Sequence, residues 1–436
     1  MGCNVPRVLC LVLLLGAAAA AGADWPQWRG TNRDGVSPEG SGWPTGWPPR
    51  ELWKRNVGHG CTSPVVAGEH LYVMGWRGKP DRRTNPNGTD VVYCLDRTTG
   101  DVLWQQQYPA RYQGRHRRGD LQRYGGPSST PTFDPETSNL YTIGIDGEFS
   151  CWNTRDGGKL RWGMNLYDRY GVGQRPNAGG GTRDFGFVAS PLVHGDVVIV
   201  EVGDDEGTLM AFDRRTGERR WASDYARPAG HTGGPVPIRM AGEDCVAALS
   251  LEYLVVIRAE PPNAGRTLLR HAWQTHFACN IPTPAVTGGG IVLTSGYNHR
   301  ETVLLRPSAS GARRVWRSGR HAIASSPVVN AGQVFVLSGA LSCLDLETGA
   351  VRWSGGRFGH GSCIATADHR LIVFGEGGDL VLLDARPEVG RYTELSRLDG
   401  LVPATCYPHV AFRCGIIYCK DKAGNLVALS VGDGER

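Results

Sequence analysis

An eleven-residue motif occurs three times along the chain and constrains the fold more than any other feature. The copies start at Cys94, Ala211 and Cys343, and each reads small or apolar–x–Asp–x–x–Thr–Gly–x–x–x–Trp. Asp can accept hydrogen bonds from turn amides, and Gly supplies the positive φ that short hairpin loops need. The closing Trp buries a large apolar surface. The motif therefore predicts a β-hairpin, and its recurrence predicts a repeat protein.

A second signal, a small residue followed by Pro and an apolar strand, opens each repeat. It occurs at Ser63-Pro64, Thr130-Pro131, Ser190-Pro191, Gly234-Pro235, Thr283-Pro284 and Ser326-Pro327, with weaker forms at Ser362-Cys363 and Tyr407-Pro408. The repeats close on Trp104, Trp162, Trp221, Trp273, Trp316 and Trp353, with a degenerate seventh close at Tyr392 to Leu395. These positions define eight units.

The eighth unit ends without a closing strand, whereas an orphan Trp-bearing strand, Leu52-Trp53, precedes the first unit. Pairing this strand with the last unit would close a ring and remove exposed sheet edges. The sequence therefore predicts an all-β fold, an eight-bladed β-propeller of four-stranded antiparallel blades with an N-terminal strand closing the last blade. A solenoid is the alternative architecture, but it leaves Trp53 unexplained.

The ends of the chain have their own composition. Arg7, an apolar run and Ala21-Gly22-Ala23 are typical of a secretory signal peptide over residues 1–23. We expect an extended Trp- and Pro-rich arm over 24–50, a single propeller over 51–431 and a tail over 432–436. The apolar run is too short to span a bilayer. The protein is thus predicted to be exported, to the periplasm or the extracellular space, with no membrane span, as a monomer.

Charge and cysteine content narrow the classes of function. The net charge of +5, from 47 basic and 42 acidic residues, gives no nucleic-acid footprint. Cys94, Cys151 and Cys343 occupy one repeat position, which favours small buried core residues. Cys406, Cys414 and Cys419 could include one disulfide. The absence of any C-x-x-C sequence argues against a zinc site.

The repeat resembles the tryptophan-docking motif of the quinoprotein (pyrroloquinoline quinone, PQQ) propeller superfamily. The arm sequence Trp25-Pro26-Gln27-Trp28-Arg29-Gly30 is similar to that of exported PQQ-like repeat proteins of planctomycete-type bacteria. The resemblance implies that each Trp docks on the neighbouring blade, at Trp53, Trp104, Trp162, Trp221, Trp273, Trp316 and Trp353. The superfamily contains PQQ-dependent dehydrogenases and also a non-enzymatic outer-membrane assembly lipoprotein, so the fold leaves function open.

Candidate ligand residues precede the first strands of several units, on one face of the expected ring. They are His59, His231, His321 and His360, with His276 a little further away. Imidazoles could form a metal or proton-transfer site, or could simply cap repeated turns. Two long insertions on the same face carry Arg115, Arg117, Arg118 and Arg183, which suit a carboxylate-bearing or sulfated ligand or, alternatively, form a solvated surface.

The residues expected of a quinoprotein dehydrogenase are not evident. The resemblance implies two adjacent cysteines and a Glu/Asn/Asp set around calcium, but no Cys-Cys occurs and that set cannot be assigned. There is also no C-x-x-C-H haem site. We therefore predict a non-catalytic binding or scaffold module with no cofactor and no bound metal, whose looped face takes a protein, peptide or glycan. The alternative is a PQQ-dependent alcohol or sugar dehydrogenase.

Overall fold

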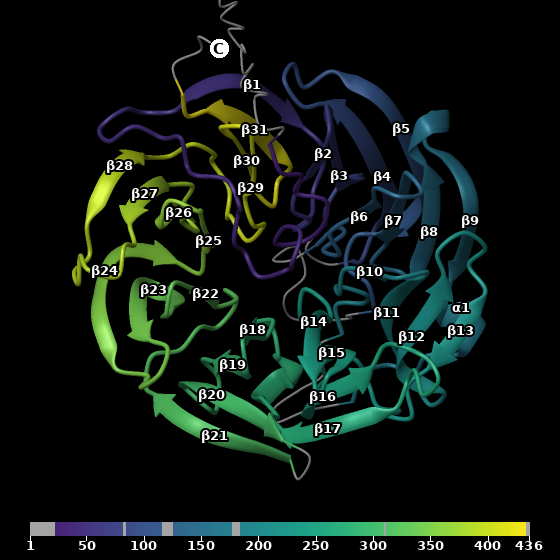
Figure 1. Ribbon diagram of the computed structural model, residues 1–436. Helices are drawn as coiled ribbons and strands as arrows, with labels where there is room; N and C mark the ends of the chain where they lie inside the picture. Colours follow the sequence, from purple (N-terminus) through teal and green to yellow (C-terminus); the bar gives the residue numbers. More distant parts are fainter. Residues whose placement is uncertain (1–21, 82–83, 116–124, 177–183, 309–310, 433–436) are drawn as a thin grey trace, which may run out of the picture.

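Eight small sheets surround a central axis in the computed structural model, which describes residues 22–81, 84–115, 125–176, 184–308 and 311–432 (Figure 1). Seven sheets have four strands and one has three, and every pairing between strands is antiparallel. The predicted eight-bladed, all-β propeller is confirmed. Most of the predicted leader lies outside the described residues. No helix in the described ranges is both long and apolar enough to cross a membrane.

The strands are grouped here by blade, numbered one to eight along the chain. Blade one contains Val65–Ala67 (β2), His70–Arg77 (β3), Asn87–Asp96 (β4) and Val102–Arg111 (β5); blade two Thr132–Asp134 (β6), Asn139–Ile143 (β7), Glu148–Asn153 (β8) and Lys159–Asn165 (β9); blade three Leu192–His194 (β10), Val197–Asp204 (β11), Gly207–Asp213 (β12) and Arg219–Ala222 (β13); blade four Val236–Met240 (β14), Glu243–Leu249 (β15), Tyr253–Arg258 (β16) and Thr267–Ala272 (β17).

The second half of the ring repeats this order. Blade five contains Ala285–Thr287 (β18), Gly290–Ser295 (β19), Glu301–Ser308 (β20) and Gly311–Ser318 (β21); blade six Val328–Asn330 (β22), Gln333–Asp345 (β23) and Val351–Gly359 (β24); blade seven Ser362–Ala365 (β25), Arg370–Phe374 (β26), Leu380–Asp384 (β27) and Glu394–Leu398 (β28); blade eight Ala411–Arg413 (β29), Ile416–Lys420 (β30), Asn425–Ser430 (β31) and Arg50–Asn56 (β1). The helical elements are Thr154–Asp156 (η1), Leu166–Tyr170 (α1) and His276–Ala278 (η2).

The ring closes by strand exchange between the two ends of the chain. Strand β1 pairs antiparallel with β31, and Trp53 lies opposite Ala428 (Figure 1). The edge of blade eight is thereby covered, as the orphan strand predicted. Blade six differs from the others because β23 is a single long strand. Its first residues pair with β22 and its last with β24, so β23 takes the place of two middle strands.

The small-Pro openings explain how neighbouring blades are joined around the channel. The N–H of Ser63 donates to Oγ1 of Thr130 at 3.0 Å, and the N–H of Thr130 donates to Oγ of Ser190 at 3.0 Å. In blade eight the N–H of His409 donates to Oγ of Ser63 at 2.9 Å. The same bond links blades five and six. Hydroxyl residues at the openings thus satisfy N–H groups that lie two residues before the inner strands, where no sheet hydrogen bond reaches them.

The motif tryptophans lie between blades. A Cβ on Gly100, where φ is +74°, would lie 2.5 Å from the Trp53 ring, and Trp53 Nε1 donates to the carbonyl of Arg97 at 3.1 Å. The ring therefore sits on the motif glycine of the next blade. Trp104, Trp162 and Trp316 lie in the same way against Gly158, Gly217 and Gly349, Trp221 lies near Gly265, Trp273 stacks on His299, and Trp353 meets Tyr392.

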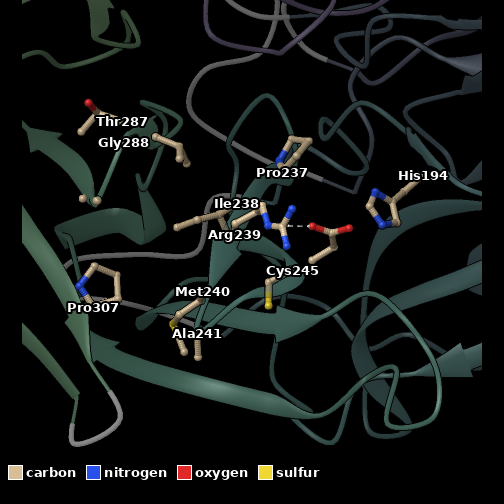
Figure 2. A pocket seen from close by; sticks show the side chains of 14 residues that line it. His194, Pro237, Ile238, Arg239, Met240, Ala241, Cys245, Thr287, Gly288 and Pro307 are labelled. Atoms are coloured by element: carbon tan, nitrogen blue, oxygen red, sulfur yellow. Dashed lines mark ion pairs between the residues drawn. The ribbon is translucent and has the colours of Figure 1, made fainter.

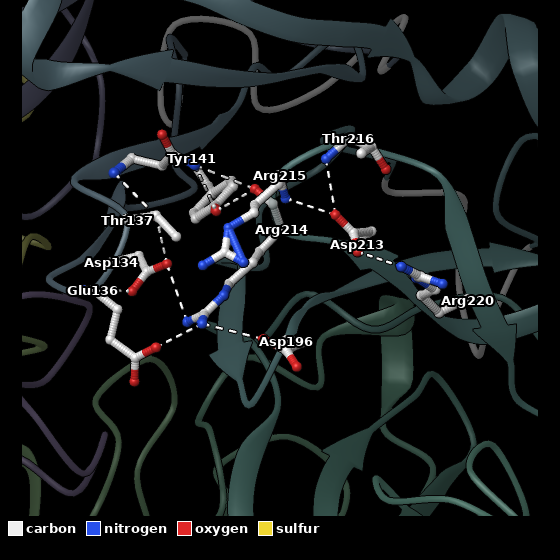
Figure 3. Close-up of polar contacts among 11 residues, drawn as sticks. Asp134, Glu136, Thr137, Tyr141, Asp196, Asp213, Arg214, Arg215, Thr216 and Arg220 are labelled. Atoms are coloured by element: carbon white, nitrogen blue, oxygen red, sulfur yellow. Dashed lines mark hydrogen bonds and ion pairs between the residues drawn. The ribbon is translucent and has the colours of Figure 1, made fainter.

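An ion-pair network joins blades two and three next to the central motif copy (Figure 3). Arg214, 7% exposed, reaches Asp134 at 3.3 Å, Glu136 at 2.6 Å and Asp196 at 3.2 Å. The carbonyl of Arg214 accepts from the Tyr141 hydroxyl at 2.6 Å. Asp134 is almost fully buried, and the pair with Arg214 offsets part of the cost of removing its carboxyl group from water.

The ten described cysteines are all free thiols. Cys94, Cys151 and Cys343 are buried among apolar neighbours, as their shared repeat position predicts. The possible disulfide among Cys406, Cys414 and Cys419 is not formed: all three are free thiols, with Cys414 exposed at a turn and Cys406 and Cys419 buried in one apolar cluster. The cysteines therefore contribute packing and no cross-link.

Candidate functional site

A pocket of about 250 Å³ opens at the mouth of the central channel. The segment before the first strand of every blade contributes to it, because each of these segments ends at the axis. The lining residues are Trp28, Cys61, Ser128, Phe185, Val188, His231, Thr232, Gly233, Cys279, Ile281, Tyr297, Ile323, Ala324, Ser325, Ser326, His360, Gly361, Tyr407 and His409. We call this the mouth pocket. A site that draws on all eight blades can form only once the ring is closed.

The N-terminal arm supplies the floor of the mouth pocket. At its start the arm pairs with the inner strand of blade one, where the backbones of Trp25 and Val66 exchange two hydrogen bonds. Further along, it pairs with the inner strand of blade seven, where Val36 forms a β-bridge with Ala365. Between these points the arm turns inside the channel and places Trp28, 7% exposed, in the pocket lining. The channel is thus plugged by the protein's own chain below the mouth pocket.

Close contacts fix the orientation of Trp28. Its ring lies edge-on to the His409 ring, with centroids 5.4 Å apart and planes at 68°. A Cβ on Gly233 would lie 2.4 Å from the indole, so only glycine fits there. The Arg29 guanidinium lies 5.4 Å from the ring centroid. With neighbours this close, the floor of the pocket is preformed.

Two buried arginines hold the arm in the channel without reaching the pocket lining. Arg29 Nη2 donates to the carbonyl of Pro327, and Arg33 Nη2 donates to the carbonyl of Ser190 at 3.0 Å. Burial lowers the pKa of Arg29 to about 10 and that of Arg33 to about 9, so both stay cationic at neutral pH. Near Arg33, burial raises the pKa of Glu201 to about 7. These charges lie behind the floor.

None of the described residues that line the mouth pocket is Asp, Glu, Lys or Arg. Among its imidazoles, burial and the nearby Arg29 charge lower the pKa of His409 to about 3. His409 therefore remains neutral across the physiological range. The pocket combines aromatic rings, aliphatic side chains, hydroxyls, thiols and imidazoles.

Three buried polar atoms of the lining have no hydrogen-bond partner among the described residues. They are Oγ of Ser325, Nδ1 of His360 and Nδ1 of His409. Buried polar atoms are normally satisfied by protein or by ordered water. These atoms mark where a polar group of a ligand, or a water, would be bound.

The structure brings together two of the four predicted histidines. His231 and His360 line the mouth pocket, and the Phe185 ring lies edge-on to His231 at 5.6 Å. His59 instead bridges to Trp76 through its backbone, and His321 lies near the carbonyl of Gly319 at 3.2 Å. No three His, Cys, Asp or Glu side chains in the described part of the chain are grouped to hold a metal ion.

The two insertions contact each other beside the pocket. Arg115 Nη1 donates to the carbonyl of Val172 at 2.7 Å, and its guanidinium lies 4.3 Å from the Tyr167 ring centroid. A buried pair, Arg175 with Asp184 at 2.6 Å, anchors the second insertion next to Phe185. Arg115 thus holds one insertion to the other. The predicted ligand residues Arg117, Arg118 and Arg183 lie outside the described residues.

Sequence reasoning did not assign Trp28, Tyr297, Cys279 or His409 to the site. His409 takes in blade eight the place that Ser63 takes in blade one, because the N–H of each donates to a hydroxyl of the next blade's opening. A histidine where other blades carry Ser or Thr was the available signal. Trp28 had none, because the arm has no repeat that would place it relative to the axis.

A second hollow, of about 620 Å³, lies at the opposite ends of the inner strands of blades four and five (Figure 2). Ile238 and Met240 of β14 and Val286 of β18 form its apolar walls, and Arg239 pairs with Asp244 at 3.5 Å on its side. Its described lining combines this exposed ion pair with a glycine-rich turn. We refer to it as the lower groove.

Comparison with known proteins gives one family and several shared architectures. The family model described as outer membrane protein assembly factor BamB matches residues 88–355 and 313–436. No protein with a curated description matches the chain. BamB from Moraxella catarrhalis is 12% identical, with a TM-score of 0.57, over 88% of this chain and 100% of that chain.

Two further solved structures resemble this ring. Quinohemoprotein alcohol dehydrogenase from Comamonas testosteroni is 14% identical, with a TM-score of 0.60, over 95% of this chain and 81% of that chain. The C-terminal WD40 domain of Sif2 is 9% identical, with a TM-score of 0.56, over 89% of this chain and 99% of that chain. At these identities the likeness concerns the fold alone.

Proposed function

Because the chain belongs to the PQQ-like β-propeller family of outer membrane protein assembly factor BamB, we propose that it is an exported, non-catalytic binding module that holds its ligand in the mouth pocket. The observation that carries this proposal is a single preformed pocket to which all eight blades contribute and whose floor is the plugging arm. Concave, mostly apolar pockets with a few convergent polar groups are the usual form of ligand sites.

The composition of the lining supports binding over catalysis. Enzymes stabilise developing charge with placed cations, metals or oxyanion donors. The described lining contains no Asp, Glu, Lys or Arg, and the described histidines, cysteines and acids form no metal-binding group of three. Binding needs only shape and a few hydrogen bonds, both of which the mouth pocket offers.

The residues present do not fit PQQ, the cofactor implied by the alternative function. PQQ is a planar quinone with three carboxylates, and guanidinium or ammonium groups are its natural partners. Arg29 and Arg33, the arm cations inside the channel, bind backbone carbonyls behind the floor and do not line the pocket. An anionic quinone in this pocket would lose its hydration without gaining a charged partner.

The proposal extends to location and partners. BamB is described as an outer-membrane assembly factor, and this chain has a predicted leader. Both support the proposal that the protein acts in the periplasm or outside the cell; we further propose that it is a monomer and that a protein, peptide or glycan group enters the mouth pocket.

A fragment screen with a blocked pocket tests this proposal. Ala324→Trp and Ser128→Phe each fill the mouth from opposite sides of the ring, and Gln107→Trp on the exposed outer strand β5 is the matched control. Ligand-observed NMR is expected to find compounds that bind the wild type and the control but neither blocked variant. If every bound compound keeps its affinity in both folded variants, the mouth pocket is not the binding site and the proposal fails.

A further inference from the structure

On the basis of the function proposed above, we propose that the group held in the mouth pocket is an uncharged aromatic ring that carries a hydrogen-bonding group, of the phenol or indole type. Three properties of the pocket lead to this chemistry: its aromatic surfaces, the absence of Asp, Glu, Lys and Arg from its described lining, and the unpartnered polar atoms in that lining.

Aromatic surfaces are the first property. Trp28 forms the floor, and Phe185, Tyr297 and Tyr407 add rings around the cavity of about 250 Å³. Ring pairs in edge-on or offset contact are worth more than their buried area alone. Because His409 and Gly233 already fix the Trp28 ring, a ligand ring would not have to order the floor on binding.

Charge is the second property. A carboxylate would find no Arg or Lys in the described lining. A cation over the indole would meet the Arg29 guanidinium, which already lies 5.4 Å from the Trp28 centroid and stays charged at neutral pH. A neutral ring avoids both costs. The described lining offers single hydroxyls and imidazoles but no Asp, Glu, Asn, Gln or Arg, whose planar groups could bind two neighbouring hydroxyls of a sugar at once.

The unpartnered atoms are the third property. Ser325 Oγ and His360 Nδ1 are buried in the lining without a hydrogen-bond partner among the described residues. A phenol O–H or an indole N–H can donate to an imidazole nitrogen or a hydroxyl oxygen. A plain hydrocarbon ring would leave these atoms unsatisfied, at a cost.

The test is a calorimetric titration of the whole protein with matched probes: p-cresol and 3-methylindole, with toluene, benzoate, benzylammonium and methyl glucoside as comparators. We expect p-cresol or 3-methylindole to bind at least about tenfold more tightly than every comparator. N-acetyl-tyrosinamide and N-acetyl-tryptophanamide test whether the ring belongs to a polypeptide or to a small molecule. If they bind more tightly than the free rings, the ligand is a polypeptide side chain; if they bind more weakly, it is a small molecule. Either result is consistent with an aromatic ring as the bound group.

Two serines at equivalent places in the ring provide a matched pair of variants. Ser325 and Ser129 both have a buried Oγ without a partner, but only Ser325 lines the mouth pocket. Ser325→Ala is expected to weaken the preferred ring about fivefold, the size of one ordinary hydrogen bond, and Ser129→Ala to leave it unchanged. Equal affinity of toluene and p-cresol would refute the hydrogen-bonding group.

The proposal of an uncharged phenol- or indole-type ring is overturned if benzoate, benzylammonium or methyl glucoside binds most tightly. If Ala324→Trp and Ser128→Phe abolish that binding, the proposed binding function still stands. Binding of no compound at the mouth in the fragment screen would overturn the proposed function as well, so the two failures are distinguishable.

Discussion

Replacing either of two adjacent glycines measures how firmly a motif tryptophan docks on the next blade. Gly157 and Gly158 both have positive φ, +58° and +72°. A Cβ on Gly157 would meet nothing within 4 Å, whereas a Cβ on Gly158 would lie 2.5 Å from the Trp104 ring. Gly157→Ala therefore costs only the left-handed backbone, about 1–2 kcal/mol. Gly158→Ala adds overpacking of the ring, about 1–3 kcal/mol more.

Trp104→Ala removes the ring that the new methyl group would strike. In that background, Gly158→Ala is expected to cost no more than Gly157→Ala, which gives a coupling of about 1–3 kcal/mol in a double-mutant cycle. Urea unfolding followed by linear extrapolation measures each free energy of unfolding. The docking account is refuted if the two single variants are equally stable, or if the excess cost of Gly158→Ala persists without Trp104.

Three further changes have defined outcomes. Trp53→Ala removes a buried indole that helps to close the propeller, and is expected to lower the free energy of unfolding by about 3–5 kcal/mol. The matched control is Trp47→Ala: the Trp47 side chain is 59% exposed, so its loss should change the free energy of unfolding by less than about 0.5 kcal/mol. Similar unfolding midpoints in urea for the two variants would contradict this prediction. Burial alone would raise the pKa of Asp213, but the Arg220 hydrogen bond and the turn amides lower it to about 2. Because the carboxyl has a lower pKa in the folded protein than in the unfolded chain, it stabilises the fold at pH values above its pKa in the unfolded chain. Asp213→Asn should therefore destabilise the protein fully above about pH 4, and the difference from the wild type should shrink as the pH falls toward 2. A difference in unfolding midpoint that does not change with pH would exclude this linkage. Trp28→Ala removes the pocket floor, and NMR titration should show at least about a tenfold loss of fragment affinity at the mouth, with unchanged affinity counting against the floor.

The repeat pattern predicted the fold because its signals are local. The turn Asp, the motif Gly and the closing Trp each act within one hairpin or on the next one, so their spacing in sequence matches their spacing in the ring. The orphan Trp53 strand predicted closure, and its pairing with β31 confirms it. The merged strand β23 in blade six was not predicted, since no sequence signal distinguishes it from two short strands.

The candidate site was only partly predictable. His231 and His360 precede inner strands, so they were expected near the axis, where the structure places them. The plug was not expected, because it depends on contacts between residues far apart in sequence, such as Arg29 with Pro327 and Arg33 with Ser190. The arm contains no copy of the repeat, so the repeat spacing could not predict its position.

The most direct test of the central claim compares the two ligand chemistries in separate titrations of the same protein. The purified protein would be titrated with PQQ in the presence of calcium and, separately, with p-cresol and 3-methylindole, with dye-linked oxidation of alcohols and sugars assayed alongside. The account predicts saturable binding of an uncharged ring that Ala324→Trp abolishes, with no retained PQQ and no turnover. Stoichiometric PQQ with dye reduction above the protein-free rate would contradict it.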